Sequence, residues 1–357
     1  MNSTNSKQLR LCSIASDNGT YTVTIDGDFY LGTNTSLISN NAGRAGLIKC
    51  IIGGNFTVNG VLAGNFDFTG SNAEFDLSGN LILESTTSLT KGTGGTTALV
   101  FKKSGTQDYT NSSSVVLPAW DIIVNSGSTL NIADQLITGA ANFTLNSGAT
   151  LQTSHTNGVN ENLTTSGAVA LGSAANFIFY GTGSQATRAL LTTAGSLTIA
   201  NPVGVNLSTN VTTSILTINT SDILNIPASK QLTVSTTMTN NGILNLLSNT
   251  SNETATILTP ASISGSGTTN VIQYLARGRN WYVSSPVSEV TVVVPSGLTF
   301  FGYQEDGTNT YMTTSGTTAN WKPYVQGSAL TTGKGNIAQP SMETILIFSG
   351  TLNVNQK

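Results

Sequence analysis

The chain has 357 residues, of which only 9% are charged, and its 14 Lys and Arg against 17 Asp and Glu give a net charge of −3. No basic run occurs, so the sequence lacks the electrostatic footprint of a nucleic-acid-binding protein, and we expect no nucleic-acid partner. No apolar run reaches about 18 residues, so we expect no membrane-spanning segment. Hydrophobic residues make up 38% in regular alternation, which predicts a folded chain with a surface of hydroxyl and amide groups.

Short strand-like segments begin at Tyr21 and recur along the chain. Apolar and polar residues alternate in each segment, as in a half-buried strand. Gly or Asn separates the segments about every ten residues, which is typical of sandwiches, barrels and solenoids. Five of these segments read YTVTID, NFTVNG, NFDFTG, EFDLSG and NLILES. The sequence therefore predicts an all-β protein.

Internal repetition selects the solenoid. Residues 51–83 repeat Gly-Asn-Phe or Gly-Asn-Leu, and Gly-Asp-Phe at 27–29 is an earlier copy. We expect Gly or Asn at each corner to adopt φ > 0, and Phe or Leu to point inward onto the coil below. Two longer pairs also align, LVFKKSGTQ (99–107) with FIFYGTGSQ (177–185) and FTLNSGATL (143–151) with LTINTSDIL (216–224). Such repetition predicts a right-handed parallel β-solenoid (β-helix) with degenerate repeats over residues 1–270.

The last part of the chain differs in composition. Aromatic residues are about twice as dense after residue 270, which favours a second module with a conventional core. We predict a smaller antiparallel β-sandwich-like module over residues 271–357. The segment GSGTTN (265–270) is predicted to be a linker, and YQEDGTNTYM (303–312) a hairpin turning at Asp306-Gly307.

Two sets of motifs carry a resemblance. The segments FIFYGTGSQ, LTIAN, GVNL, LTIN and LNIPASKQLTV resemble the repeated solenoid region of large surface and secreted proteins of Bacteroidetes. The later motifs resemble the domain that often follows such repeats; they are Tyr274-Leu275, Gly278-Arg279-Asn280-Trp281, Ser284-Ser285-Pro286, Gly333-Lys334-Gly335 and Ile347-Phe348-Ser349-Gly350-Thr351-Leu352-Asn353.

The resemblance implies export through the outer membrane, commonly by the type IX route, and a location outside the cell or on the outer-membrane surface. Proteins of this kind carry a signal peptide and a C-terminal sorting domain. The start MNSTNSK lacks the apolar core of a secretory signal, and the chain stops at Lys357 just after the Gly-Thr-Leu-Asn strand. We therefore expect a fragment.

Parallel solenoids also include polysaccharide-cleaving enzymes, which need paired carboxylates or a base with a cation. The carboxylates closest in sequence are Asp26 with Asp28 and Glu305 with Asp306. The Ile-Asp-Gly-Asp-Phe context of the first pair favours a turn. His155, the only histidine, lies in TSHTNG, and we expect it to be a solvated loop residue.

Other candidate sites have simpler explanations. Lys334 between two glycines does not complete a phosphate-binding loop and predicts a tight turn. Cys12 and Cys50 could form a disulfide or remain two buried thiols. We therefore predict no catalytic, cofactor-binding or metal-binding residues and no cofactor. Trp120 is expected to pack at a solenoid turn, and four aromatic residues are expected in the core of the C-terminal module, with a sugar platform as the alternative: Trp281, Tyr282, Trp321 and Tyr324.

The sequence favours a non-catalytic cell-surface or extracellular protein with a structural or adhesive role, whose partners are surface glycans or other cell-surface proteins. The alternative is a carbohydrate-binding or carbohydrate-degrading β-helix protein, which predicts a groove with clustered charged residues on one face. A third hypothesis is a phage or autotransporter-type fibre, which predicts a trimer or a C-terminal barrel.

Overall fold

The structure is a computed structural model, in which the chain forms two compact units, Met1–Leu197 and Thr198–Lys357. It describes residues 7–11, 19–32, 35–38, 46–59, 66–67, 72–84, 89, 91, 95–112, 114–260, 262–288, 294–303, 321–324 and 330–353. The described residues are almost all in strands and turns, with one short helix, α1 (Gly158–Asn162).

The strands of the first unit are β1 (Lys7–Arg10), β2 (Thr20–Ile25), β3 (Phe29–Leu31), β4 (Thr35–Ile38), β5 (Leu47–Ile52), β6 (Phe56–Asn59), β7 (Phe66–Asp67), β8 (Asn72–Leu77), β9 (Leu81–Glu84), β10 (Thr97–Phe101), β11 (Gly105–Asn111), β12 (Asp121–Val124), β13 (Ser128–Ala133), β14 (Ile137–Gly139), β15 (Asn142–Leu145), β16 (Thr150–Thr153), β17 (Leu163–Thr165), β18 (Val169–Leu171), β19 (Asn176–Phe179) and β20 (Gln185–Ala186). The unit boundary falls inside β21 (Thr193–Ile199).

The strands of the second unit are β22 (Val205–Asn206), β23 (Val211–Ile218), β24 (Ile223–Ile226), β25 (Gln231–Asn240), β26 (Ile243–Leu246), β27 (Thr256–Leu258), β28 (Ile263–Ser264), β29 (Thr268–Leu275), β30 (Trp281–Val283), β31 (Val287–Ser288), β32 (Leu298–Tyr303), β33 (Trp321–Pro323), β34 (Asn336–Pro340) and β35 (Thr344–Leu352).

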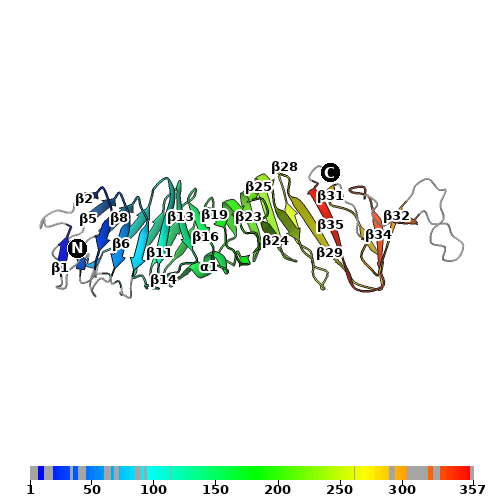
Figure 1. The fold of residues 1–357 in the computed structure, drawn as a ribbon, viewed down its shortest axis with the longest axis horizontal. Coiled ribbons are helices and arrows are strands. Elements are labelled where there is room, and N and C mark those ends of the chain that lie inside the picture. The colour runs from blue at the N-terminus through cyan, green and yellow to red at the C-terminus, as the bar shows by residue number, and fades with distance from the viewer. Residues whose placement is uncertain are drawn as a thin grey trace. The chain divides into compact units, whose positions relative to one another are not determined.

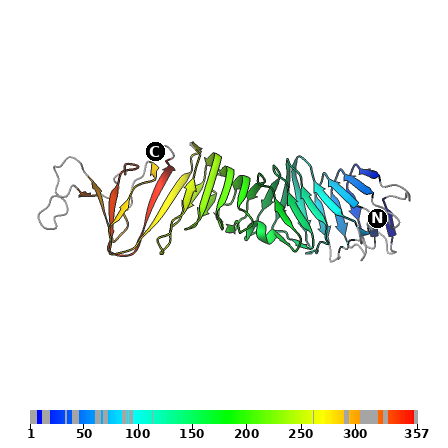
Figure 2. The ribbon, with the colours of Figure 1, turned by 180° about the vertical axis from the view of Figure 1, so that it is seen from behind.

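Parallel strands of the first unit stack into two long runs, ordered β18-β15-β12-β10-β8-β5-β2 and β19-β16-β13-β11-β9-β6-β3. Each coil places one strand in the first run, turns a corner and places the next strand in the second (Figure 1). Thr20 pairs with Leu47, and Leu47 pairs in turn with Asn72, so each coil lies on the preceding one. The same stacking is seen from behind in Figure 2. The predicted all-β parallel solenoid is confirmed.

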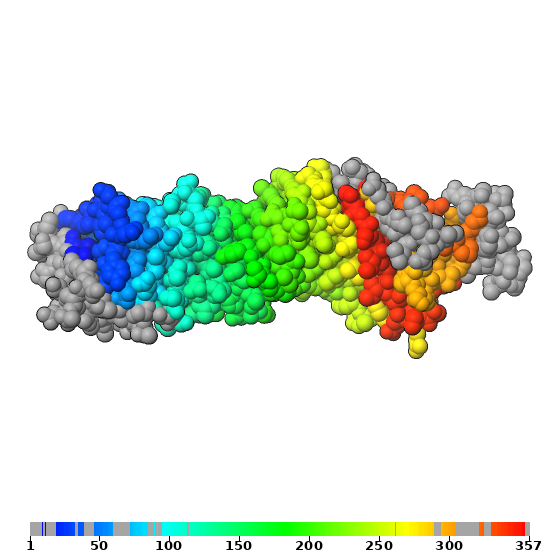
Figure 3. All heavy atoms as spheres, viewed as in Figure 1, coloured from blue at the N-terminus to red at the C-terminus, as the bar shows by residue number. Residues whose placement is uncertain are grey.

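The interior of the coils is a column of apolar side chains. Alternate residues of β5, β6, β12 and β16 are buried, as the period of two in the sequence predicts. The ring of Phe56 stacks between the rings of Phe29 and Phe75, with centroid distances of 5.3 and 5.7 Å. The Phe residues of the Gly-Asn-Phe motif therefore point inward, as expected. Successive coils of this unit form adjacent bands in Figure 3.

The corner glycines of this motif do not have the expected backbone conformation. Gly27, Gly54 and Gly79 are absent from the positions with φ > 0, so that prediction is wrong. Glycine is needed because the coils approach closely: a Cβ on Gly54 would overlap Asp28, and a Cβ on Gly79 would overlap the backbone of Gly54. The Asp28 side chain accepts the Asn55 N–H at 2.7 Å, which confirms its predicted turn role.

Positive φ is used at a second type of corner. There, a four-residue turn closes between the first carbonyl and the fourth N–H, and its third residue is left-handed. The turns are Asn125–Ser128 with Gly127 at φ 81°, Asn146–Ala149 with Gly148 at 80°, Asn219–Asp222 with Ser221 at 68°, and Pro227–Lys230 with Ser229 at 63°.

The described ion pairs gather on the outer face of β5, β8 and β10. Lys49 pairs with Glu74 and, at 2.9 Å, with Asp76, and Lys102 also pairs with Asp76. The Asp76 side chain is only 1% exposed. Burial by itself would raise the pKa of Asp76, but hydrogen bonds from Lys102 and Lys49 lower it below its ordinary value.

The second unit begins with parallel coils and ends in antiparallel sheets. Strand β29 pairs in parallel with β26 along one edge and antiparallel with β35 along the other. Strands β30, β34, β32 and β33 form a further antiparallel sheet. The predicted change to an antiparallel module is confirmed, but the predicted linker is wrong, because Thr268–Asn270 belong to β29. The predicted boundary between residues 270 and 271 also lies within this strand.

The core of the antiparallel module is formed by buried apolar residues: Leu275, Val287, Leu298, Phe300, Leu330, Ala338, Leu346 and Phe348. Trp281 and Tyr324 pack against this core, whereas Tyr282 is 78% exposed. Trp321 packs edge-on against Tyr303 at 5.1 Å. The four aromatic residues therefore form neither a single platform nor a single core. Residues 304–312 of the predicted hairpin lie outside the described residues.

Candidate functional site: a polar groove in the first unit

Two cavities of the first unit share Asp134, and we call them together the Asp134 groove. The smaller, about 300 Å³, is lined by Asn111, Ser112, Ser114, Asp134, Gln135 and Leu136. The larger, about 690 Å³, is lined by Asp134, Ser154, His155, Thr156, Tyr180, Gly181, Thr182 and Gly183. Both volumes are of the order of small-molecule sites.

The groove follows the carboxyl ends of four strands that are neighbours in one parallel sheet, β11, β13, β16 and β19. Each strand contributes the first residues after it ends. Adjacent strands lie about 4.8 Å apart, so three steps give the groove a length of roughly 14 Å. Stacking of coils thus brings together residues from 111 to 183 of the sequence.

A bulge in β13 positions Asp134. The register with β16 shifts between Asn131 and Ala133, and Ala133 has φ 46°, which is unusual for a residue with a side chain. A bulge changes the direction of the side chains that follow it. Asp134 is exposed in consequence and borders both cavities.

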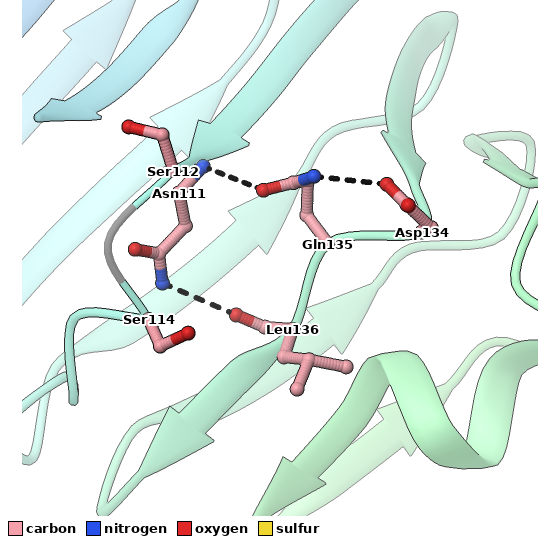
Figure 4. Close-up of a pocket in the computed structure, with 6 residues that line it drawn as sticks. All are labelled: Asn111, Ser112, Ser114, Asp134, Gln135 and Leu136. Atoms are coloured by element: carbon pink, nitrogen blue, oxygen red, sulfur yellow. Dashed lines mark hydrogen bonds between the residues drawn. The ribbon is translucent and has the colours of Figure 1, made fainter.

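The walls of the smaller cavity are held by amide groups (Figure 4). Gln135 donates from Nε2 to Asp134 Oδ1 at 2.9 Å, and its Oε1 accepts the Asn111 N–H at 3.1 Å. The buried Asn111 side chain accepts from Val115 N at 2.7 Å and donates to the carbonyls of Val115 and Leu136. The Asn111 bonds hold the buried part of this wall, and the Gln135 bond orients the exposed Asp134 carboxylate.

Tyr180 borders the larger cavity and is held by a network across coils. Its hydroxyl donates to Asn131 Oδ1 at 2.6 Å, and Asn131 Nδ2 donates to Asp108 Oδ1 at 2.8 Å. Burial raises the pKa of the Tyr180 phenol, and this effect outweighs the hydrogen bonds to Ser154 and Asn131, which lower it. The bond to Asn131 holds the hydroxyl end of the ring in place.

His155 lies in the loop that follows β16, as expected, and is half-buried in the lining of this groove. Its Nδ1 accepts the Asn157 N–H at 3.1 Å, so in the neutral ring the proton is on Nε2. The buried Gln185 donates to the His155 carbonyl at 3.1 Å and accepts the Gly181 N–H at 2.8 Å. Gln185 thus joins two walls of the larger cavity.

Other candidate residues lie elsewhere. Lys334 lies in a turn closed by its N–H to the Thr331 carbonyl at 3.1 Å, as predicted. Trp120 is buried directly before β12, which confirms its packing role. Cys50 is a buried free thiol, and burial, followed by the charge of Asp76, raises its pKa to about 11. Cys12 lies outside the described residues.

Among the described residues, no three His, Cys, Asp or Glu side chains lie close enough together to hold a metal ion. In the same part of the chain, no helix has the length and apolar character needed to cross a bilayer.

Comparisons with known protein families, curated proteins and solved structures give no match to this chain. The properties of the Asp134 groove therefore follow from its own residues. The described lining contains one carboxylate, one imidazole, one phenol and several hydroxyl groups, but no Lys or Arg. Such a surface can exchange hydrogen bonds with a polar, uncharged molecule.

No local sequence pattern indicates this groove, because its residues come from four coils and depend on a bulge. The one available indication was the aligned pair of segments ending in Gln107 and Gln185, since the second segment supplies Tyr180 and the following loop.

Proposed function

We propose that the protein is a non-catalytic structural or adhesive protein of the cell surface or extracellular space. The observation that carries this proposal is the use of outward-facing amides to join coils. In the second unit, each side chain of a ladder hydrogen-bonds the next; its members are Asn206, Asn225, Asn245, Asn270 and Ser349. A surface built in this way suits a durable scaffold with few ionisable groups.

The resemblance of the repeats to surface proteins of Bacteroidetes supports the same role, with export by the type IX route. Weak contacts repeated along stacked coils can sum to firm attachment to glycans or to other surface proteins.

Location is tested by antibody labelling of cells that produce the protein. We expect intact cells, or their medium, to carry the antigen, and mild protease treatment of intact cells to remove it. Labelling that requires permeabilised cells would contradict the proposal. Beads coated with the purified chain test adhesion, since they should bind to such cells or their matrix more than beads coated with albumin.

The second candidate is carbohydrate binding or cleavage. The described lining of the Asp134 groove has one carboxylate and no Lys or Arg, so it lacks the cluster of charged residues that this candidate predicts, and its hydrogen-bonding groups favour binding over cleavage. This lining is rich in hydrogen-bonding groups and lies along stacked strands. Incubation with fluorescently labelled oligosaccharides separates binding from cleavage. Binding leaves the length of the oligosaccharide unchanged, whereas shorter labelled products that accumulate with turnover would show an enzyme.

A further inference from the structure

The charge of the Asp134 groove restricts its ligand. Asp134 lies at the junction of the two cavities. Asp108 is linked to the Tyr180 hydroxyl through hydrogen bonds of Asn131. The described lining has no Lys or Arg to balance a polyanion. An acidic polysaccharide would therefore be repelled.

The hydrogen-bonding groups suit hydroxyls. Gln135 donates to Oδ1 of Asp134, and Oδ2 has no hydrogen-bond partner among the described residues. A carboxylate oxygen held in this way can accept a ligand O–H in a charge-assisted bond. The hydroxyls of Ser112, Ser114 and Thr156 are on exposed residues of the same lining and can both donate and accept.

Tyr180 supplies an aromatic surface in the larger cavity. Because Asn131 holds its hydroxyl at 2.6 Å, the ring is fixed before binding, which reduces the entropy lost on association. A fixed aromatic ring beside hydrogen-bonding groups suits a ligand that has both C–H faces and hydroxyl edges.

We propose that the Asp134 groove binds a neutral oligosaccharide, with Asp134 between two subsites and Tyr180 in the larger one. The roughly 14 Å that separate the ends of β11 and β19 allow the ligand to extend across four coils. This inference rests on the proposed attachment to surface glycans and names the site and the class of glycan.

Isothermal titration calorimetry of the whole chain tests the proposal. The probes are neutral hexasaccharides of glucose, mannose, xylose and N-acetylglucosamine in their common linkages, with hexagalacturonate as the charged counterpart. We expect at least one neutral probe to bind and hexagalacturonate not to bind. Asp134→Ala should weaken that affinity roughly tenfold or more, because a bond to a charged group is lost.

Further variants assign the effect to the groove. Tyr180→Ala should also weaken binding, whereas Tyr180→Phe keeps the ring and should retain more of the affinity. Asp121→Ala is the matched control, since Asp121 is a half-buried carboxylate that is not among the lining residues of either cavity and bonds Asn142 at 2.7 Å. Thermal melting of each variant verifies that it is folded.

Three results would overturn the proposal: binding of no neutral probe, binding of hexagalacturonate alone, or binding that neither Asp134→Ala nor Tyr180→Ala weakens. Cell labelling and bead adhesion give independent results. Surface location with adhesion but without groove binding would reject this inference and leave the proposed function in place.

Discussion

Gln107 and Gln185 form the same three hydrogen bonds at two different corners of the first unit. Each Oε1 accepts the N–H four residues earlier, at 3.0 Å from Lys103 and 2.8 Å from Gly181. Each Nε2 donates to two carbonyls of an earlier coil. The strand before Gln107 is β10 in the first run, and the strand before Gln185 is β19 in the second.

Replacing either glutamine should destabilise the protein. Gln107→Ala leaves Leu77 O, Gly79 O and Lys103 N without these bonds in a buried corner, so we expect a loss of about 2–3 kcal/mol in the free energy of unfolding. Gln185→Ala should cost a similar amount. Denaturant titration measures both losses.

The control is Gln231→Ala, because Gln231 is half-buried and its side chain bonds Thr233 at 3.1 Å. A loss below about 1 kcal/mol is expected there. Equal losses at all three positions would show that the corner bonds contribute nothing special.

The Asp76 carboxylate should make stability depend on acid pH. Its pKa is lowered in the folded protein, so its contribution is complete above the unfolded value near 3.8 and is lost as pH falls through the lower, folded value. We expect Asp76→Asn to be less stable than wild type by about 2 kcal/mol at pH 7. The gap should close as pH falls below about 4.

Denaturant titrations from pH 7 to pH 2.5 measure this gap. Asp121→Asn is the comparison, since the Asp121 side chain is bonded to Asn142 and not to a lysine. A gap for Asp76→Asn that stays constant over this range would refute the role given to the lysines.

Ser221→Gly should stabilise the protein. Ser221 is exposed with φ 68°, a conformation that costs a side-chain-bearing residue energy and glycine none. We expect a gain of about 0.5–1 kcal/mol, measured by thermal and denaturant unfolding. Ser173→Gly, in the turn that Ala175 closes onto Gly172 without positive φ, should give no gain.

Cys50 should be inert in the folded protein. With a pKa of about 11, roughly one thiol in a thousand is ionised at pH 8, and the side chain is buried. In a Cys12→Ser background, a thiol reagent should react only after denaturant is added. Rapid labelling of the native chain would contradict the burial of Cys50, and Cys12→Ser/Cys50→Ser gives the blank.

Alternation of apolar and polar residues was sufficient to predict the strands, because burial of one face imposes a period of two on each strand. The repeated Gly-Asn-Phe motif was needed to select the solenoid among all-β folds. The inward Phe56 and the turn at Asp28 followed from the same pattern. The reason for glycine at the corners was harder to predict. Close approach of two coils and a positive φ both select glycine, and only the coordinates show which of the two applies at a given corner.

The aligned segments indicated repetition but not its geometry. The copies share a corner, including its glutamine, while lying in different runs of strands. Beyond the repeated segment that supplies Tyr180, the Asp134 groove could not be predicted, because it depends on the bulge at Ala133 and on which loops are neighbours after stacking.

Strand β29 has a consequence for assembly. One edge of β29 pairs with the parallel strand β26, and the other edge pairs with the antiparallel strand β35. A further parallel rung cannot be added where β35 already lies, so this boundary acts as a stop for end-to-end polymerisation. Deleting β35 would leave this edge of β29 unpaired, and we expect the shortened chains to associate into fibrils.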